Sequence, residues 1–192
     1  MLALLTSVAT FSASAQDKKT AETPTPAAAD DTTPNDYELI GIGTLRMSIP
    51  KTWQGKFTHD MQMGVPIDNL DLHESDTNVF RIIVSAIHKS DSKPDDFQAM
   101  KEGLTKVARI ELADAGEKEL NLRDFKEGEV QGCYFTLTDM HPKPGEYKFL
   151  TQGFAQMKGV VLTFRVVSNR QNGVERAQTL AMIKSARILP KK

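Results

Sequence analysis

The segment Val79-Phe-Arg-Ile-Ile-Val-Ser-Ala-Ile87 is the most informative one for the fold, because it carries apolar residues in both phases of a β-strand. Its even-numbered positions are Phe, Ile, Val and Ala, and three odd-numbered positions are Val or Ile. A strand that is apolar on both sides is covered on both faces of its sheet. Residues 160–168 repeat this pattern, with Val160, Leu162, Phe164 and Val166 on one side and Val161 and Val167 on the other. We therefore expect two central strands.

Other strands are predicted on both sides of these two segments. Gly43-Thr-Leu-Arg-Met-Ser-Ile-Pro50 alternates apolar and polar residues, which is typical of a half-buried strand, and we expect it to be the first one. Three further strands are predicted at 118–126, 130–139 and 147–157, which with 160–168 make four consecutive strands. Their short links require antiparallel neighbours, because a parallel crossover needs a dozen residues or more.

Two helices are predicted. Ser92-Lys-Pro-Asp95 resembles a capping box, and Gly116 can supply a left-handed C-terminal residue. Between them, apolar residues recur at helical spacing, at Phe97, Met100, Leu104, Val107, Ala108 and Leu112. A closing helix is predicted from Asn172-Gly-Val-Glu175, and it should present to the sheet its apolar residues Val174, Ala177, Leu180, Ala181 and Ile183.

This order of elements predicts an α+β fold. Central strands need cover on both faces, and one helix on each face supplies it. We therefore expect an α/β/α sandwich around a mainly antiparallel sheet, with helices on both faces.

The N-terminal region predicts export. Residues 1–15 are uncharged and largely apolar, and they end in Ala13-Ser14-Ala15, a pattern that signal peptidase accepts. We expect a signal peptide at 1–15, a disordered polar linker at 16–36 and a single domain at 37–192, released to the periplasm or secreted. A membrane anchor is the alternative, but Ser and Thr interrupt the run, and a span needs about 20 apolar residues. No Lys or Arg precedes Lys18, so a start upstream of Met1 stays open.

Charge and cysteine content restrict the functional classes. Residues 37–192 hold 22 basic and 20 acidic side chains, a balance that does not indicate nucleic acid or an anionic membrane as partner. Cys133 is the only cysteine, so no internal disulfide can form. It alternates with Phe135 and Leu137, which predicts a buried, inert thiol on one strand face. An exposed thiol that forms a mixed disulfide is the alternative.

Three short motifs indicate a family. Met47-Ser-Ile-Pro-Lys-Thr-Trp53, Val161-Leu-Thr-Phe164 and Ile183-Lys-Ser-Ala-Arg-Ile188, in this order of elements, resemble the PsbP-like superfamily and its bacterial DcrB-like relatives. The resemblance extends over nearly all of 37–192. It implies an α/β/α sandwich that known members use as a noncatalytic adaptor, chaperone or accessory subunit.

Catalytic motifs are missing from the sequence. It has no G-x-S-x-G, no G-x-x-x-x-G-K and no H-E-x-x-H, and Gly41-Ile-Gly43 precedes a strand pattern where a dinucleotide motif needs a helix. We interpret that glycine pair as a bend. The acidic segment 68–76 lacks the central Gly of a calcium loop. We therefore expect no enzyme, no catalytic residue and no cofactor; a hydrolase using His73 and Glu74 is the least supported alternative.

The segment His59-Asp-Met61-Gln-Met63 predicts the one candidate metal site. On an extended backbone the imidazole and both thioethers share one face, and both ligand types suit Cu(I). The alternative is that the methionines fill a hydrophobic gap. The other histidines, at 73, 88 and 141, have no ligand-like spacing.

Two further features are candidates for binding, Trp53 and the pair Arg165 and Arg170. Trp53 either belongs to the core, the favoured interpretation, or is an exposed binding anchor. Arg165 and Arg170 could bind an anion together.

The sequence as a whole predicts an exported, soluble, nonenzymatic accessory or binding protein without stable membrane insertion after signal cleavage. Its partner is another envelope protein or a small ligand, and periplasmic copper handling is the alternative.

Overall fold

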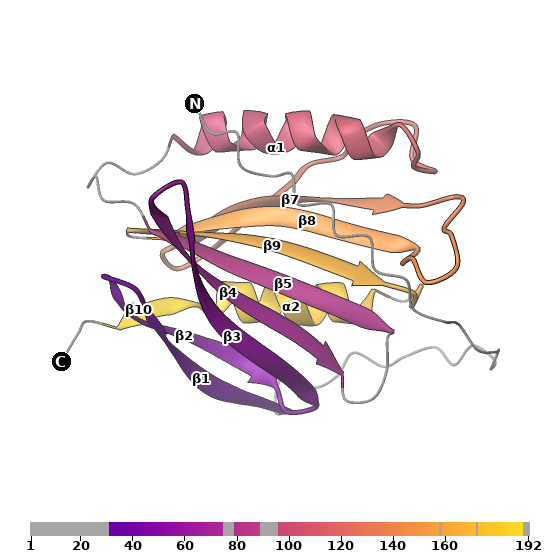
Figure 1. The fold of residues 1–192 in the computed structure, drawn as a ribbon. Coiled ribbons are helices and arrows are strands. Elements are labelled where there is room, and N and C mark those ends of the chain that lie inside the picture. Colours follow the sequence, from indigo (N-terminus) through magenta and orange to yellow (C-terminus); the bar gives the residue numbers. More distant parts are fainter. Residues whose placement is uncertain (1–30, 75–78, 89–95, 158, 172, 190–192) are drawn as a thin grey trace.

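The computed structural model describes residues 31–74, 79–88, 96–157, 159–171 and 173–189. Ten strands and two helices lie in these ranges, and the strands form two antiparallel sheets (Figure 1). The larger sheet has seven strands and the smaller one has three. Neither of the two helices in these ranges is long and apolar enough to cross a membrane.

The larger sheet has the strand order β3-β4-β5-β9-β8-β7-β6. Its strands are β3 (Trp53–Gln62), β4 (Val65–Glu74), β5 (Phe80–His88), β6 (Arg123–Glu127), β7 (Val130–Thr138), β8 (Phe149–Met157) and β9 (Val160–Ser168). The predicted antiparallel meander is confirmed in β6 to β9, although β6 begins five residues later than expected.

The two segments that are apolar on both sides are the adjacent strands β5 and β9. Val84 pairs with Phe164 in their antiparallel register, and each strand has a second neighbour, β4 or β8. Phe80, Ile82, Val84, Leu162, Phe164 and Val166 are all at least 97% buried. The prediction of two central strands is confirmed.

The smaller sheet has the order β1-β2-β10 and was not predicted as a unit. Its central strand is β2 (Gly43–Pro50), flanked by β1 (Thr32–Leu39) and β10 (Arg187–Leu189). The chain bends at the glycine pair, as expected: Gly41 lies in the turn between β1 and β2, Gly43 begins β2, and both residues have positive φ. β1 begins five residues before the expected domain boundary at 37.

The predicted α/β/α sandwich is wrong, because the molecule is mainly β and a second sheet forms one of its layers. The smaller sheet and α2 (Val174–Lys184) share one core with the larger sheet, and α2 contacts β2 and β9. We call the side of the larger sheet that faces this core the inner face. α1 (Phe97–Leu112) packs on the opposite face, over β7 and β8 (Figure 1). The side that was assigned to a helix alone is thus covered by α2 together with a three-stranded sheet.

The predicted helix around 97–112 is confirmed. Its two ends differ from the prediction, because Asp96 is the N-cap and Gly116 does not end the helix in a left-handed conformation. Asp96 is the N-cap, and its carboxylate accepts a hydrogen bond from the Gln98 N–H at 2.9 Å. The expected capping box at 92–95 lies outside the described residues. Gly116 does not adopt the left-handed conformation; its N–H donates to the Thr138 carbonyl at 2.8 Å instead.

The closing helix α2 is confirmed, and its predicted buried face is right in part, since Ile183 lies in the core and Leu180 packs against it. Ala177 and Ala181 are exposed, and only Ile183 of the expected set is fully buried. The residues that face the sheet are Glu175, Thr179, Met182 and Ile183. The helix is therefore oriented by a buried carboxylate and a hydroxyl as much as by apolar contacts.

Candidate functional site

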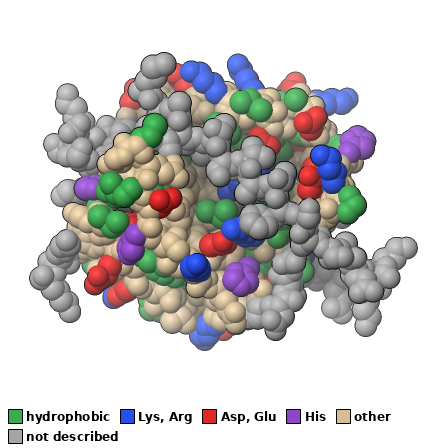
Figure 2. Space-filling view, in the orientation of Figure 1, with side chains coloured by type: hydrophobic (Ala, Val, Ile, Leu, Met, Phe, Trp, Pro, Cys, Tyr) green, Lys and Arg blue, Asp and Glu red, His purple; other side chains and the backbone are tan. Residues whose placement is uncertain are grey.

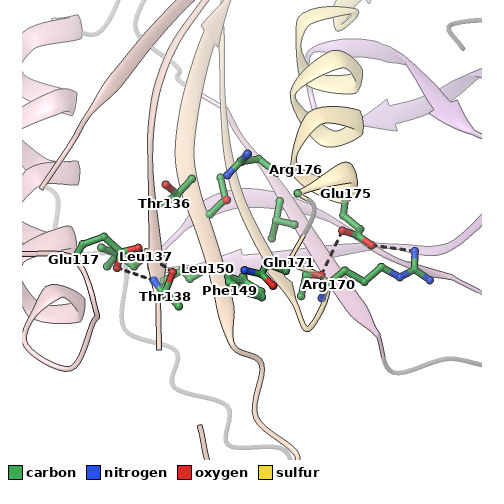
Figure 3. A pocket seen from close by; sticks show the side chains of 14 residues that line it. Glu117, Thr136, Leu137, Thr138, Phe149, Leu150, Arg170, Gln171, Glu175 and Arg176 are labelled. Atoms are coloured by element: carbon green, nitrogen blue, oxygen red, sulfur yellow. Dashed lines mark hydrogen bonds and ion pairs between the residues drawn. The ribbon is translucent and has the colours of Figure 1, made fainter. Parts of the chain in front are cut away.

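A cavity of about 230 Å³ lies on the inner face, between β7, β8, the end of β9 and the start of α2 (Figure 3). We call it the α2 pocket. Its lining includes hydroxyl, guanidinium and carboxylate groups from Thr136, Thr151, Ser168, Arg170, Glu175 and Arg176. Four of these residues lie between positions 168 and 176, and the fold places them against Thr136 of β7 and Thr151 of β8.

Glu175 supplies the buried charge beside the pocket. Its side chain is 1% exposed, and its carboxylate accepts from the Arg170 guanidinium at 3.0 Å and from the Ser168 hydroxyl at 3.3 Å. Arg170 also donates to the Glu74 carboxylate at 2.6 Å. A buried carboxylate needs such partners, since an unpaired one is strongly unfavourable. The network ties α2 to the ends of β9 and β4.

Arg176 differs from Arg170, because its guanidinium has no hydrogen bond or ion pair with any described residue. Its guanidinium lies over the N-cap residue Gly173, where an added Cβ would be 2.8 Å from Nη2. Figure 3 shows the side chain extending from α2 across the sheet towards Thr136. The hydroxyls of Thr136 and Thr151 likewise have no hydrogen-bond partner among the described residues.

Among the described residues that line the α2 pocket, Arg176 is the cation without an ion pair and Glu117 is the anion without one. Glu175 is neutralised by Arg170, and the Glu117 carboxylate accepts from the N–H and hydroxyl of Thr138 at 2.8 and 2.9 Å. Arg176 is then the charged donor that remains available. A guanidinium binds carboxylate or phosphate through two parallel hydrogen bonds, so this arrangement can hold a small anion.

A second polar cluster lies at the other end of the inner face, beside the β3–β4 hairpin. His59 Nδ1 is 2.6 Å from the Asp68 carboxylate, which is 3% exposed and pairs with His59 across the two strands. The other Asp68 oxygen accepts from the Ile40 N–H at 3.0 Å. We call His59, Met61 and Asp68 the hairpin site.

The predicted metal segment is only partly placed on one face. His59 and Met61 both lie in β3, two residues apart, and therefore point to the same side. Met63 lies in the hairpin turn with φ of 50°, so strand alternation does not extend to it. Met61 and Met63 are 58% and 80% exposed, which rules out the gap-filling interpretation.

The remaining candidate residues have mostly structural surroundings. Trp53 is buried with its ring centroid 5.4 Å from that of Phe80, so the core interpretation is confirmed. Cys133 is fully buried as predicted, and burial together with the neighbouring Asp124 carboxylate raises the pKa of its thiol to about 12. Lys101 donates to Asp124 at 2.7 Å and lowers the pKa of that carboxyl.

The structure separates the two residue pairs that the sequence offered only as alternatives, Arg165 with Arg170 and His73 with Glu74. Arg165 lies near Glu111 of α1 at 3.4 Å, whereas Arg170 pairs with carboxylates on the other side of the sheet. His73 and Glu74 are consecutive in β4 and point to opposite faces, and Glu74 is bound to Arg170. Arg176 and the threonine hydroxyls were not predicted, since a single Arg on a helix carries no recognisable motif.

Side chains on the surface are mixed in charge. Figure 2 shows Lys and Arg interspersed with Asp and Glu over the described residues of this face. Hydrophobic and histidine side chains gather at its left end, where Figure 1 places the β3–β4 hairpin. Exposed hydrophobic residues of this end include Ile40, Met61 and Met63.

Comparison with known proteins identifies no family for this chain. No family model matches the chain, and no curated protein matches it either. The resemblance to the PsbP-like superfamily therefore stays a prediction, and the functional argument rests on the two clusters described above.

Proposed function

We propose that this protein is an exported, noncatalytic binding protein that holds a small anion in the α2 pocket. The carrying observation is Arg176, whose guanidinium lines a cavity without an ion pair among the described residues. The resemblance to noncatalytic PsbP-like proteins supports the same class of function.

The groups around Arg176 favour an anion that also carries hydroxyls. Thr136 and Thr151 add hydroxyls without partners in the described structure, and each can donate and accept. The pocket also lies at the N-terminus of α2, where the helix dipole favours negative charge. A small hydroxycarboxylate or a phosphate ester satisfies all three groups.

The carboxylates of the pocket support binding without turnover. Glu175 is paired with Arg170 and Ser168, and Glu117 is bound by the N–H and hydroxyl of Thr138, which favours a structural role for both carboxylates. The expected result of an activity screen is no turnover by the wild type, and a His73→Ala variant that behaves identically. Turnover that His73→Ala abolishes would instead support the hydrolase alternative.

Calorimetric titration with citrate and with inorganic phosphate tests the binding site. We expect Arg176→Ala to weaken binding at least tenfold, since a charge-assisted hydrogen bond contributes about 1.5–3 kcal/mol. Arg109→Ala is the matched control, because Arg109 is exposed on α1, on the opposite face of the sheet. Equal affinity in both variants, or no binding of any hydroxycarboxylate or phosphate by the wild type, contradicts the proposal.

Export needs its own measurement. The full chain is expressed in a bacterium that has a periplasm, and the cytoplasmic, periplasmic and culture fractions are separated. We expect the protein in the periplasm or in the medium. Intact-mass analysis should give a mature chain that begins at Gln16. A cytoplasmic, uncleaved protein would remove the exported part of the proposal and leave the binding site untouched.

A further inference from the structure

The hairpin site holds an imidazole in the arrangement that metal-binding histidines use. Asp68 is buried, and its two oxygens contact His59 Nδ1 at 2.6 Å and the Ile40 N–H at 3.0 Å. A carboxylate only accepts hydrogen bonds, so Nδ1 carries the proton. The lone pair of the neutral ring is then on Nε2. Carboxylate–histidine pairs of this kind orient metal ligands in many proteins and raise their basicity.

The position of the ring is fixed on its other side as well. Phe57, two residues earlier on the same strand face, contacts His59 edge-on with ring centroids 5.1 Å apart. Met61, two residues later, lies on that same face. The imidazole therefore stands between a packed aromatic ring and an exposed thioether. Half of its side-chain surface, 51%, is accessible, so a ligand can reach it.

The donor set selects a soft metal. Among the described residues, no three His, Cys, Asp or Glu side chains are grouped to hold a metal ion, which disfavours the sites that Zn²⁺ or Ca²⁺ require. A thioether and an imidazole are instead ligands of Cu(I). Met61 and Met63 are 58% and 80% exposed, so both thioethers are accessible to an incoming metal ion.

We propose that His59 Nε2 and Met61 Sδ bind Cu(I) at the β3–β4 hairpin, with Asp68 as a positioning residue. Met63, at the turn, is the candidate third ligand. The site is independent of the α2 pocket, because the two lie at opposite ends of the inner face (Figure 1). Loss of one activity therefore leaves the other intact.

Anaerobic competition between the purified chain and the Cu(I)–bicinchoninate complex tests the proposal. The wild type should withdraw one equivalent of Cu(I), and Met61→Leu should weaken the affinity at least tenfold without loss of folding, since Leu keeps the size of the side chain. Met140→Leu is the matched control, because Met140 is 56% exposed but belongs to the segment after β7. A wild type that takes no Cu(I), or equal affinities in the two variants, overturns the proposal.

Asp68→Asn tests the positioning role. The Ile40 N–H holds the amide oxygen, so the amide NH₂ faces His59 and donates to Nδ1. The proton then moves to Nε2, and the lone pair is lost from the proposed ligand atom. We expect a 10–100-fold weaker Cu(I) affinity, together with a change of His59 tautomer in ¹⁵N NMR. A changed tautomer with unchanged affinity contradicts the role of Nε2.

Met63→Leu decides the third ligand. If Met63 binds, this variant loses affinity and X-ray absorption shows one sulfur fewer around the copper than in the wild type. Unchanged spectra restrict the site to His59 and Met61, with an external third ligand. Arg176→Ala should keep full Cu(I) affinity, and this result separates a failure here from a failure of the anion-binding proposal.

Discussion

A buried carboxylate lies at each end of the inner face of the larger sheet, Glu175 from α2 above it and Asp68 from the sheet itself, and the two differ in their partners. Glu175 is 1% exposed and is bound by Arg170, whereas Asp68 is 3% exposed and is bound by His59. A guanidinium has only donors, so Arg170 satisfies Glu175 and offers nothing to a metal. An imidazole keeps a second nitrogen. The same structural need, a partner for a buried charge, thus leaves a closed network at one end and an open ligand atom at the other.

Both carboxylates also connect the layers of the molecule. Glu175 belongs to α2 and, through Arg170, is joined to Glu74 at the end of β4. Asp68 belongs to β4 and binds the backbone of Ile40 in the turn between β1 and β2. One carboxylate therefore fixes the helix and the other fixes the smaller sheet. Their removal should affect stability to different degrees.

Glu175→Ala should have the largest effect, a loss of about 3 kcal/mol in the free energy of unfolding. Removing one partner of a buried pair costs about 3–5 kcal/mol, and the partial exposure of Arg170 places this case at the lower end. Urea denaturation measures the change. Glu38→Ala is the control, because Glu38 is exposed in β1, and its effect should stay within about 0.5 kcal/mol. Similar values for both variants would mean that the network contributes no stability.

Asp68→Ala should cost less, about 2 kcal/mol. It leaves the Ile40 N–H without its acceptor, at about 1–3 kcal/mol, while His59 is half exposed and turns to water. Hydrogen exchange should show the loss concentrated in β1 and the following turn. Uniform faster exchange throughout the molecule would show instead that Asp68 supports the whole core and not the attachment of the smaller sheet.

Apolar patterning explains which parts of this fold were predictable. β5 and β9 were predicted correctly because burial on both faces leaves a continuous apolar segment. β1 was missed because only Tyr37 and Leu39 combine apolar character with an inward position, and the rest of this edge strand is polar and mostly exposed. β10 has only three residues, which is too short for an alternation of apolar and polar residues to be recognised in the sequence. Without the smaller sheet, a helical layer was the only cover available to the prediction.

The α2 helix shows where patterning fails for a physical reason. Its buried face includes Glu175 and Thr179, which are satisfied by hydrogen bonds: the Thr179 hydroxyl donates to the Glu175 carbonyl at 2.7 Å. A rule that places small apolar residues inside therefore chose Ala177 and Ala181, which are exposed. Burial of a charged residue depends on partners from other strands, and the sequence of the helix does not contain that information.

The two clusters were unequally predictable for a similar reason. His59 and Met61 are close in sequence, and strand alternation was enough to place them on one face. Asp68, the partner of His59, depends on the register of the β3–β4 hairpin. Arg176 shares its pocket with Thr151, 25 residues earlier, and with Thr136, 40 residues earlier, so neither spacing nor composition indicates its role.

Gly173→Ala should have the smallest effect on the free energy of unfolding, a loss of about 1 kcal/mol. This variant tests the role of Arg176 in the α2 pocket. Gly173 has φ of 65°, and a left-handed conformation costs an L-residue about 1–2 kcal/mol. Gly128→Ala is the matched control, because its φ is 55° and no atom lies within 4 Å of an added Cβ. At Gly173 the added Cβ would instead be 2.8 Å from Arg176 Nη2.

The two glycine variants should therefore lose similar stability in urea denaturation but differ in anion binding. Backbone strain is common to both, whereas only Gly173→Ala displaces the guanidinium that lines the pocket. Citrate titration should show weaker binding for Gly173→Ala and wild-type affinity for Gly128→Ala. Since the guanidinium is the end of a flexible side chain, it can move away at little cost in stability. Equal anion affinity in the two variants would show that the position of Arg176 over the helix start does not determine binding.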